Sequence, residues 1–86
     1  MALLDEVEAE LTKILEEVKR WIPADQLADM NELVRAGEPG VAFENLCMQL
    51  FEFDAVIPRE LVSRLQRLGD QMGIKRDYWQ RLAIED

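Results

Sequence analysis

Glycine and proline divide this chain into segments of helical length. Pro23, Pro39 and Pro58 each stand at the start of a stretch rich in apolar residues, and Gly37 and Gly73 follow two of these stretches. Proline is tolerated in the first turn of a helix, whereas glycine is the usual residue just past its end. A chain that is interrupted this often must build its core from several short helices.

Within the segments, apolar residues recur every three or four positions, which is the repeat of an amphipathic helix. No stretch alternates apolar and polar residues convincingly, so we predict no strand, and residues 54–57 are expected to form a short connector. The predicted fold is all-α, a small bundle of four to five short helices that forms a single domain over residues 1–86. The helices are expected over residues 4–20, 23–36, 38–53, 58–72 and 75–84.

The helix over residues 38–53 is expected to lie in the middle of the bundle, buried on one side and acidic on the other. Gly40 near its start would permit the close approach of a neighbour. Phe51 and Phe53 point about 200° apart on a helix because they are two positions apart. Either one of them is exposed beside acidic residues, or neighbouring elements wrap both sides of the helix end. The expected buried side is Val41, Ala42, Phe43, Leu46, Cys47, Leu50, Phe51 and Phe53.

The apolar stripes of the other helices complete the expected core. Each stripe keeps to one side of its helix, so its residues should meet those of the neighbouring helices. The expected residues are Leu4, Val7, Leu11, Ile14, Leu15, Val18, Leu27, Met30, Leu33, Val34, Leu61, Val62, Leu65, Leu68, Met72, Tyr78, Trp79 and Leu82.

The negative charge of the chain is concentrated toward its N-terminal end. The net charge is −8, and there is no histidine. Residues 1–54 contain 13 acidic and 4 basic side chains, whereas residues 55–86 contain 5 acidic and 6 basic ones. Such a surface repels nucleic acid and anionic lipid and attracts a basic protein. The distribution favours one acidic functional face; acidity that serves only solubility is the alternative.

The composition offers little for catalysis. Without histidine, the chain lacks the commonest general base and the commonest transition-metal ligand. Cys47 has no base nearby to form its thiolate, so we expect a buried structural thiol. Carboxylates one turn apart, such as Glu6 with Glu10 and Asp25 with Asp29, read as a solvated surface because no Glu-x-x-His motif or calcium loop is present. We predict no enzyme activity, no metal and no cofactor.

Six basic side chains near the C-terminal end raise the alternative of a small DNA-binding regulator. A helix-turn-helix reader needs a basic recognition helix in a basic domain, and this half of the chain is almost neutral. We expect these side chains instead to pair with nearby acids or with glutamates of the first helix. They are Arg59, Arg64, Arg67, Lys75, Arg76 and Arg81.

The expected location is the cytoplasm. The single cysteine excludes an internal disulfide, which suits a reducing compartment. The first residues lack the basic start and long apolar core of a signal peptide. No apolar run approaches the roughly 20 residues that cross a membrane, so we expect no membrane contact.

The residues around the central glycines resemble a known family. The segment from Arg35 to Phe53 contains Gly-Glu-x-Gly at a helix start, then Ala-x-Glu-Asn-Leu-Cys, and it ends in alternating aromatic and acidic residues. A helix that begins with proline follows. Over about residues 22–73, the chain is similar to bacterial immunity proteins of the MafI type.

The resemblance implies a function that no motif of the chain encodes by itself. Such small cytosolic proteins bind and neutralise the toxic C-terminal domain of a polymorphic or contact-dependent growth-inhibition toxin, and many of these domains are nucleases with a basic cleft. It implies a monomer, or a 1:1 heterodimer with the cognate toxin, that binds no nucleic acid. An acidic helical adaptor or scaffold that binds other proteins or itself is the alternative.

The candidate partner contacts are the acidic and amide residues that the expected helices leave facing outward. Phe51 or Phe53 is the candidate aromatic anchor, because aromatic side chains beside acids are typical of interface hot spots. The full set is Asp25, Asp29, Glu32, Glu38, Glu44, Asn45, Gln49, Phe51, Glu52 and Asp54.

Overall fold

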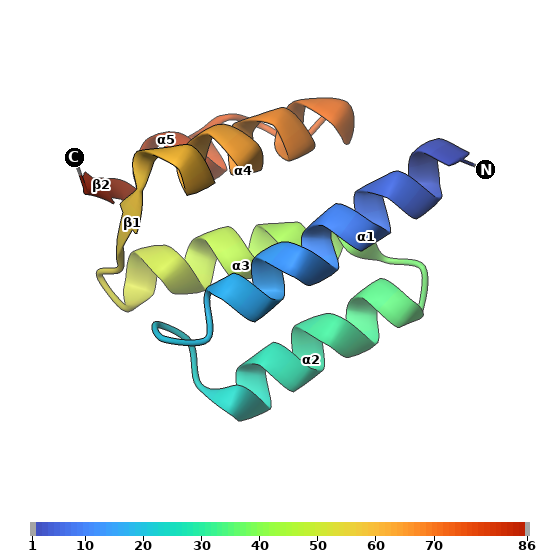
Figure 1. The fold of residues 1–86 in the computed structure, drawn as a ribbon, viewed down its shortest axis with the longest axis horizontal. Helices are drawn as coiled ribbons and strands as arrows, with labels where there is room; N and C mark the ends of the chain where they lie inside the picture. The colour runs from blue at the N-terminus through green and yellow to red at the C-terminus, as the bar shows by residue number, and fades with distance from the viewer. Residues whose placement is uncertain (1, 86) are drawn as a thin grey trace.

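The computed structural model describes residues 2–85, with side chains for residues 6–85, and it is a mainly helical bundle (Figure 1). Leu4, which we expected in the core, lies outside the described side chains. The first four helices end one to three residues earlier than the sequence predicted because turns follow them, and the last ends four residues earlier because its segment continues into β2. The elements are α1 (Ala2–Glu17), α2 (Ala24–Arg35), α3 (Pro39–Glu52), β1 (Val56–Pro58), α4 (Arg59–Gln71), α5 (Asp77–Gln80) and β2 (Ala83–Glu85).

Three helices end in the same hydrogen-bonded turn. After α2, the N–H groups of Gly37 and Glu38 donate to the carbonyls of Val34 and Leu33, at 3.1 and 2.9 Å. Gly37 has a φ of +81°. The same two bonds recur after α4, around Gly73, whose φ is +69°. This is the turn that glycine closes best, since it has no side chain to clash in the left-handed region.

The third copy of this turn, after α3, uses an aspartate in place of glycine. The N–H of Asp54 donates to the Phe51 carbonyl at 3.1 Å, and the N–H of Ala55 donates to the Leu50 carbonyl at 3.0 Å. Asp54 has a φ of +53°, and it is the one non-glycine residue with positive φ in the described part of the chain. Aspartate tolerates this conformation better than most residues but not as well as glycine.

α3 lies in the middle of the bundle, as the sequence predicted. It contacts α1, α2 and α5. In Figure 1, α1 and α4 lie in front, α3 and α5 lie behind them, and α2 runs antiparallel to α3 along the lower side. α4 packs on α1 and on the short β1–β2 pair.

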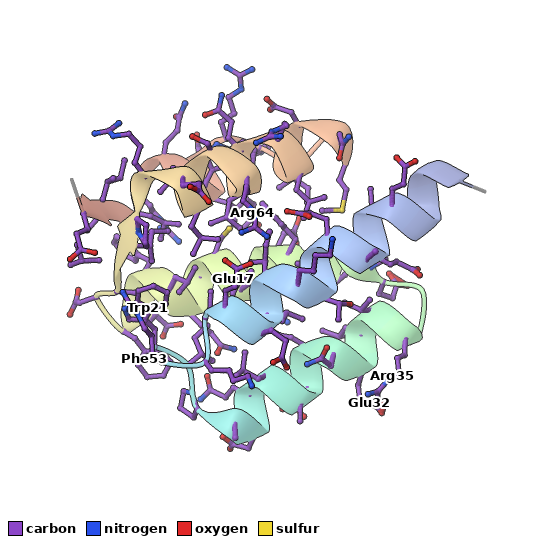
Figure 2. All side chains as sticks on the ribbon, in the orientation of Figure 1. Glu17, Trp21, Glu32, Arg35, Phe53 and Arg64 are labelled. Atoms are coloured by element: carbon purple, nitrogen blue, oxygen red, sulfur yellow. The ribbon has the colours of Figure 1, made fainter. Side chains whose placement is uncertain are left out.

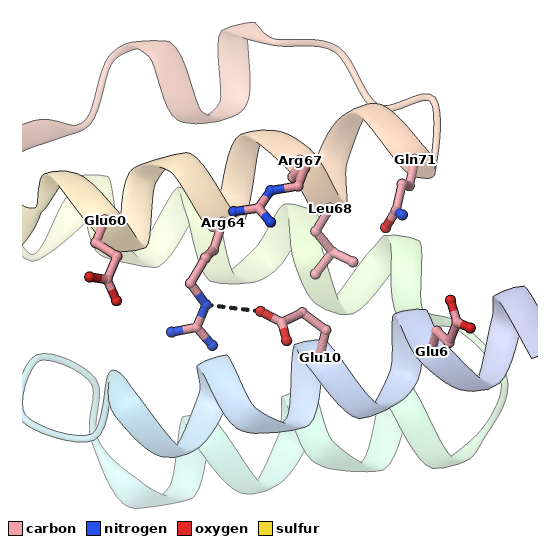
Figure 3. Close-up of a pocket in the computed structure, with 7 residues that line it drawn as sticks. All are labelled: Glu6, Glu10, Glu60, Arg64, Arg67, Leu68 and Gln71. Carbon is pink, nitrogen blue, oxygen red and sulfur yellow. Dashed lines mark hydrogen bonds and ion pairs between the residues drawn. The ribbon is translucent and has the colours of Figure 1, made fainter.

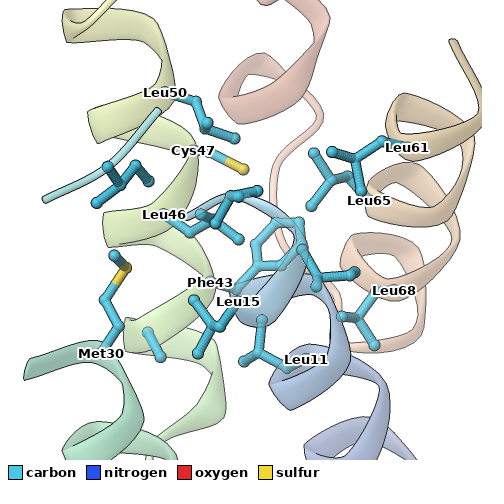
Figure 4. Close-up of a cluster of buried hydrophobic side chains, with 14 of the residues drawn as sticks. Leu11, Leu15, Met30, Phe43, Leu46, Cys47, Leu50, Leu61, Leu65 and Leu68 are labelled. Atoms are coloured by element: carbon cyan, nitrogen blue, oxygen red, sulfur yellow. The ribbon is translucent and has the colours of Figure 1, made fainter. Parts of the chain in front are cut away.

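The core is one continuous cluster between the inner sides of the four long helices. Figure 4 shows leucines of α1 and α4 meeting Phe43 and its neighbours on α3, with Met30 of α2 at the lower left. Leu33, Val62, Met72 and Tyr78, which we also expected in the core, are only partly buried around it. The buried residues are Val7, Leu11, Ile14, Leu15, Val18, Ile22, Leu27, Met30, Val34, Ala42, Phe43, Leu46, Cys47, Leu50, Ala55, Ile57, Leu61, Leu65, Leu68, Trp79 and Leu82.

The prediction that Val41 and Phe53 lie in the core is wrong. The prediction that Phe51 belongs to the buried side of α3 is wrong as well. Val41 is 42% exposed, Phe51 is 44% exposed and Phe53 is 46% exposed. The buried residues of α3 repeat at three and four and occupy only one side of that helix. The alternative in which neighbours wrap both sides of the helix end is therefore wrong, and exposure of an aromatic side chain beside the acids is confirmed, for both residues and not for one alone.

The indole of Trp79 holds the C-terminal segment against the bundle. It is 2% exposed, and its ring meets the ring of Phe43 edge to face, with centroids 5.7 Å apart. On its other side it lies on the backbone of Gly69, where a Cβ atom would come within 2.2 Å of the indole. The close approach that we expected at Gly40 is absent there, since no heavy atom lies within 4 Å of its Cβ position. That approach occurs at Gly69 instead.

A small parallel sheet corrects the prediction that the chain has no strand. β1 pairs with β2 in the register Val56–Ala83, Ile57–Ile84 and Pro58–Glu85. The last predicted helix, over residues 75–84, is correspondingly shorter and gives way to β2. Strands of three residues are too short to show an alternating pattern, so only the tertiary fold reveals them.

Replacing Gly69 by alanine should destabilise the fold strongly. The added methyl group would force the Trp79 ring off the α4 backbone, and overpacking of this kind costs about 1–3 kcal/mol. The measurement is the free energy of unfolding in urea. Gly40→Ala is the matched control: its Cβ meets open space, so stability should stay unchanged or rise by up to about 1 kcal/mol. Equal stability of the two variants would contradict the packing described here.

Candidate functional site

The two helices α2 and α3 carry an acidic surface that almost no basic side chain offsets. Residues 24–54 contain one basic residue, Arg35, whose guanidinium lies 3.4 Å from the carboxylate of Glu32 (Figure 2). None of the other acids of this stretch forms an ion pair with a residue that the structure describes. These six unpaired acids are Asp25, Asp29, Glu38, Glu44, Glu52 and Asp54.

Two acids of α1 differ from these, because both form ion pairs with Arg64 of α4. Its Nε donates to Glu10 Oε2 at 2.9 Å (Figure 3), and its Nη1 donates to Glu17 Oε1 at 2.8 Å. The hydrogen bond to Glu17 raises the pKa of the Arg64 guanidinium; burial opposes this, and Glu10 adds to it. The expectation that basic residues pair within the chain is confirmed for Arg64, and for Arg76, which pairs with Asp70 at 3.3 Å.

On α2, the predicted contacts share the outer side. Asp25, Asp29 and Glu32 follow one another at intervals of four and three, and all three are exposed. The buried residues of the helix, Leu27, Met30 and Val34, take the opposite side. A surface of this kind on one helix can meet a partner without moving the core.

On α3, the predicted contacts divide between its two edges. Asn45, Gln49 and Glu52 also recur at four and three, with the two amides half-buried. The other edge faces α5, since the Arg81 guanidinium lies 4.2 Å from the centroid of the Phe51 ring. The edge with Asn45, Gln49 and Glu52 therefore faces α2, which packs along that side of α3. Together with Asp25 and Asp29 it forms what we call the acidic face.

The remaining predicted contacts lie around this face. Glu38 directly precedes α3, and Asp54 directly follows its C-terminal turn, so they mark its two ends. Glu44 and Phe51 belong to the α5 edge and not to the acidic face. The structure thus places Asp25, Asp29 and Glu32 on one side of α2, and Asn45, Gln49 and Glu52 on one edge of α3.

One amide of the acidic face adds an acceptor to it. The Oε1 atom of Gln49 is buried and accepts no hydrogen bond from the described residues. Buried acceptors of this kind are uncommon, because leaving one unsatisfied costs about 1–3 kcal/mol.

Sequence reasoning missed an apolar stripe on the outer side of α3. Val41, Met48 and Phe51 follow at intervals of seven and three, and each is at least 36% exposed. Met48 lines a surface hollow with Lys75, Asp77, Tyr78 and Arg81. The sequence does contain a signal for this stripe. α3 has apolar residues on more than one side, and the core covers only one side, so the others must be exposed.

Cys47 is a buried thiol, as predicted. Burial raises its pKa from the ordinary 9.0 to about 12, with Arg81 opposing and Glu44 adding to the shift. A thiol held in its neutral form is a poor nucleophile. Within the described residues, no group of three Cys, Asp or Glu side chains is placed to hold a metal ion, and no helix is long and apolar enough to cross a membrane.

Comparison with protein-family models, with curated proteins and with solved structures finds no match to this chain. Function must therefore be inferred from the surface itself.

Cys47 predicts how stability changes at high pH. The folded protein keeps the thiol proton up to about pH 12, whereas the unfolded chain releases it above about 9. The free energy of unfolding therefore keeps its full value below about pH 9. Between pH 9 and 12 it falls, by at most about 1.4 kcal/mol per pH unit. Urea unfolding of the wild type and of Cys47→Ala across this range should give curves that converge as pH rises. Parallel curves would show that the thiol is accessible in the folded state.

Asp54 predicts a gain in stability on substitution. Asp54→Gly removes the strain of a side chain at positive φ, and the unfolding free energy should rise by up to about 1 kcal/mol. Gly37→Asp places the same residue in the same turn after α2, where a side chain has open space, and should lower stability by a similar amount. Thermal or urea unfolding checks both. A loss of stability in Asp54→Gly would mean that its carboxylate stabilises the turn.

Proposed function

We propose that this protein is an immunity protein that binds and neutralises the C-terminal toxin domain, a nuclease, of a cognate contact-dependent or polymorphic bacterial toxin. The observation that carries the proposal is the acidic face, whose carboxylates lack internal partners while those of Glu10 and Glu17 on α1 have one. Glu10 and Glu17 are paired with Arg64 within the fold, whereas on α2 and α3 only Glu32 has a partner, Arg35. The resemblance to MafI-type immunity proteins, which covers α2, α3 and α4, supports the same class.

The proposed mechanism is inhibition by occupation of a basic surface. A nuclease must expose basic side chains to hold phosphate, and a row of carboxylates on two rigid helices can take the place of the nucleic acid without being cleaved. Charge pairs buried in such an interface couple by several kcal/mol, and the opposite fields of the two proteins speed their encounter. Fast capture matters because each free toxin molecule turns over many substrates.

The proposal makes the protein a cytoplasmic binder that acts as a 1:1 complex, with neither an enzyme activity nor a cofactor of its own. Its contacts would be the acidic face, with Glu38 and Asp54 at the ends of α3. Phe53 is the aromatic anchor nearest this face: it follows Glu52 directly and lies at the same end of the molecule as Trp21 in Figure 2. Aromatic side chains beside charged groups are frequent among hot-spot residues.

One observation favours the alternative of a helical adaptor. The apolar stripe of α3 is exposed, and exposed apolar patches mark protein interaction sites in general. An adaptor that binds through this stripe would hold its partner as well at high salt as at low salt. The inhibitor proposed here should lose on-rate as salt rises.

The direct test is co-expression with the toxin domain encoded beside this protein. Bacteria that make the toxin domain alone should stop growing, and those that also make this protein should grow. Cell death despite abundant folded protein would overturn the proposal for that toxin.

Removing charge from the acidic face should weaken inhibition. The variant Asp25→Asn, Asp29→Asn, Glu52→Gln keeps the shapes of the side chains and should lower the on-rate for the toxin domain at least tenfold at low salt, with a smaller effect at high salt. Surface plasmon resonance against a catalytically inactive toxin domain measures this rate. The control, Glu6→Gln, Glu16→Gln, Glu85→Gln, removes the same charge from exposed positions elsewhere. Equal on-rates for the two variants would mean that net charge, and not this face, attracts the toxin.

A further inference from the structure

The two strands of the small sheet have outer edges of different kinds. β1 and β2 pair only with each other, at the left margin of the bundle in Figure 1. Proteins commonly block the edge of a sheet with proline or lysine, which keep other strands from pairing there. β1 contains Pro58, whereas β2 consists of Ala83, Ile84 and Glu85, and all three are exposed. The edge of β2 is therefore the unblocked one.

Pro58 also determines which residue of β2 directs its backbone outward. Ile57 pairs with Ile84 in the parallel ladder, and Pro58 pairs with Glu85. If Ile84 bonded to β1 with both of its backbone groups, its C=O would have to accept from the N–H of Pro58. Proline has no N–H, so Ile57 is the residue that bonds across the pair with both groups. Ile84 consequently directs its N–H and its C=O away from β1.

The outward groups of Ile84 are available for a partner. Outside the sheet, no backbone hydrogen bond joins Ile84 to a residue that the structure describes. Its side chain is on the same face of the sheet as that of Ile57, because paired residues point to one face. Ile57 is fully buried, whereas Ile84 is 37% exposed. Ile84 thus extends the apolar core to the open edge.

We propose that β2 pairs with β2 of a second copy of this chain, antiparallel, about a two-fold axis through Ile84. Two residues that lie opposite each other in an antiparallel pair can exchange both N–H···O=C bonds. The two Ile84 residues form such a pair, since each directs one donor and one acceptor outward. The two sheets then become one sheet of four strands in the order β1–β2–β2–β1. The two Ile84 side chains pack together on the face of Ile57.

The shortness of the edge favours a second copy as the occupant. Of the three residues of β2, only Ile84 presents both backbone groups outward. A longer foreign strand would leave its next N–H and C=O groups without partners on this edge. A second copy presents the same single donor and acceptor, so each of these groups is matched. Isologous contacts about a two-fold axis are also the commonest interfaces between identical chains.

The charges at the ends of the strands match in this arrangement. Asp54 and Arg81 stand two residues before β1 and β2, and Arg59 and Glu85 stand at the other end. The two-fold axis brings the start of one β2 beside the end of the other. Acid and base therefore alternate across each end of the four strands, in the order Arg59 and Glu85 of one copy, then Arg81 and Asp54 of the other. The remaining charged residue described within two positions of a strand, Glu60, lines the hollow between α1 and α4.

The dimer is weak and reversible. It rests on two hydrogen bonds and one pair of isoleucine side chains, and the charge of −8 on each copy opposes it at long range. A sheet of two short strands is marginal by itself, whereas additional strands stabilise it. Pairing therefore also orders β2. The inference does not depend on the proposed inhibitor function.

The first test is the mass of the free protein in solution. Sedimentation equilibrium from about 10 μM to 1 mM, the range in which a weak contact titrates, should show the mass rise from 10.0 kDa toward twice that value. Ile84→Lys places like charges at the axis and should weaken the association at least tenfold. Val56→Lys adds the same charge to an exposed residue of β1 and should leave it unchanged. A mass of 10.0 kDa at every concentration, or equal weakening by the two variants, would overturn the proposal.

The second test is a disulfide across the axis. Opposite residues that exchange both hydrogen bonds have Cα atoms about 5.5 Å apart, a distance that a disulfide can span. Cys47 is buried and does not compete. In a glutathione redox buffer, Ile84→Cys should form at least tenfold more covalent dimer than Val56→Cys at the same concentration. Equal yields from the two variants would count against the two-fold contact at Ile84.

A proline variant tests the backbone bonds themselves. Ile84→Pro removes the outward N–H but no hydrogen bond to β1, and an edge strand tolerates proline. It should therefore stay folded, as circular dichroism and the melting temperature will show for every variant, and it should be monomeric. Association as strong as that of the wild type would contradict the proposal.

One further variant separates this contact from the apolar stripe of α3. Phe51→Ser should leave the dimer intact. A dimer that Phe51→Ser dissolves, and that Ile84→Lys does not, would place the contact on the stripe and overturn the pairing of β2. None of these tests uses a toxin, so failure of the dimer leaves the inhibitor proposal standing, and failure of inhibition in cells leaves the dimer standing.

Discussion

The contact of Trp79 with Phe43 and Gly69 is the interaction on which the second half of the structure depends. A helix of four residues, such as α5, is too short to be stable alone, and an isolated pair of three-residue strands is marginal as well. The buried indole ties both to α3 and α4 at once. It thereby places Arg81 against Phe51 and brings β2 to β1. Without this one side chain, Arg81 and the hollow beside Met48 would have no defined position.

The carboxylates of this protein differ in whether they form ion pairs within the fold. Arg64 is only 20% exposed, and it satisfies two carboxylates of α1, so these ions stabilise the contact between α1 and α4 and leave little field outside. On α2 and α3, by contrast, Arg35 is the one cation for seven acids. Unpaired surface charge contributes little to stability and slightly opposes the compact state. In the proposed function, the carboxylates retained on these two adjacent helices serve binding.

The sequence was sufficient for the parts of the fold that local chemistry determines. The helix ends at Gly37 and Gly73, the central position of α3 and the buried thiol of Cys47 all followed from residue type and spacing. The roles of Gly69 and of β2 did not, because each depends on a partner far away in the chain. Glycine is needed at position 69 only because Trp79 packs on it. Ala83–Glu85 forms a strand only because it pairs with Val56–Pro58.

The candidate site shows the same division between local and long-range information. The spacing of Asp25 with Asp29, and of Asn45 with Gln49, was enough to place each pair on one side of its helix. Which edge of α3 faces α2, and that Glu44 and Phe51 belong to the other edge, could be learned only from the packing of α5. The stripe at Val41, Met48 and Phe51 was mistaken in part for core, since a sequence does not show where the neighbours of a helix end.

The exposed apolar side chains on the outer side of α3 have two opposite effects. A surface that is to bind tightly needs apolar side chains at its centre, but the same side chains, exposed at high concentration, favour indiscriminate association. Charged side chains flank the stripe, with Glu52 toward α2 and Lys75, Asp77 and Arg81 toward α5, and charges around an apolar strip select among the partners that could cover it.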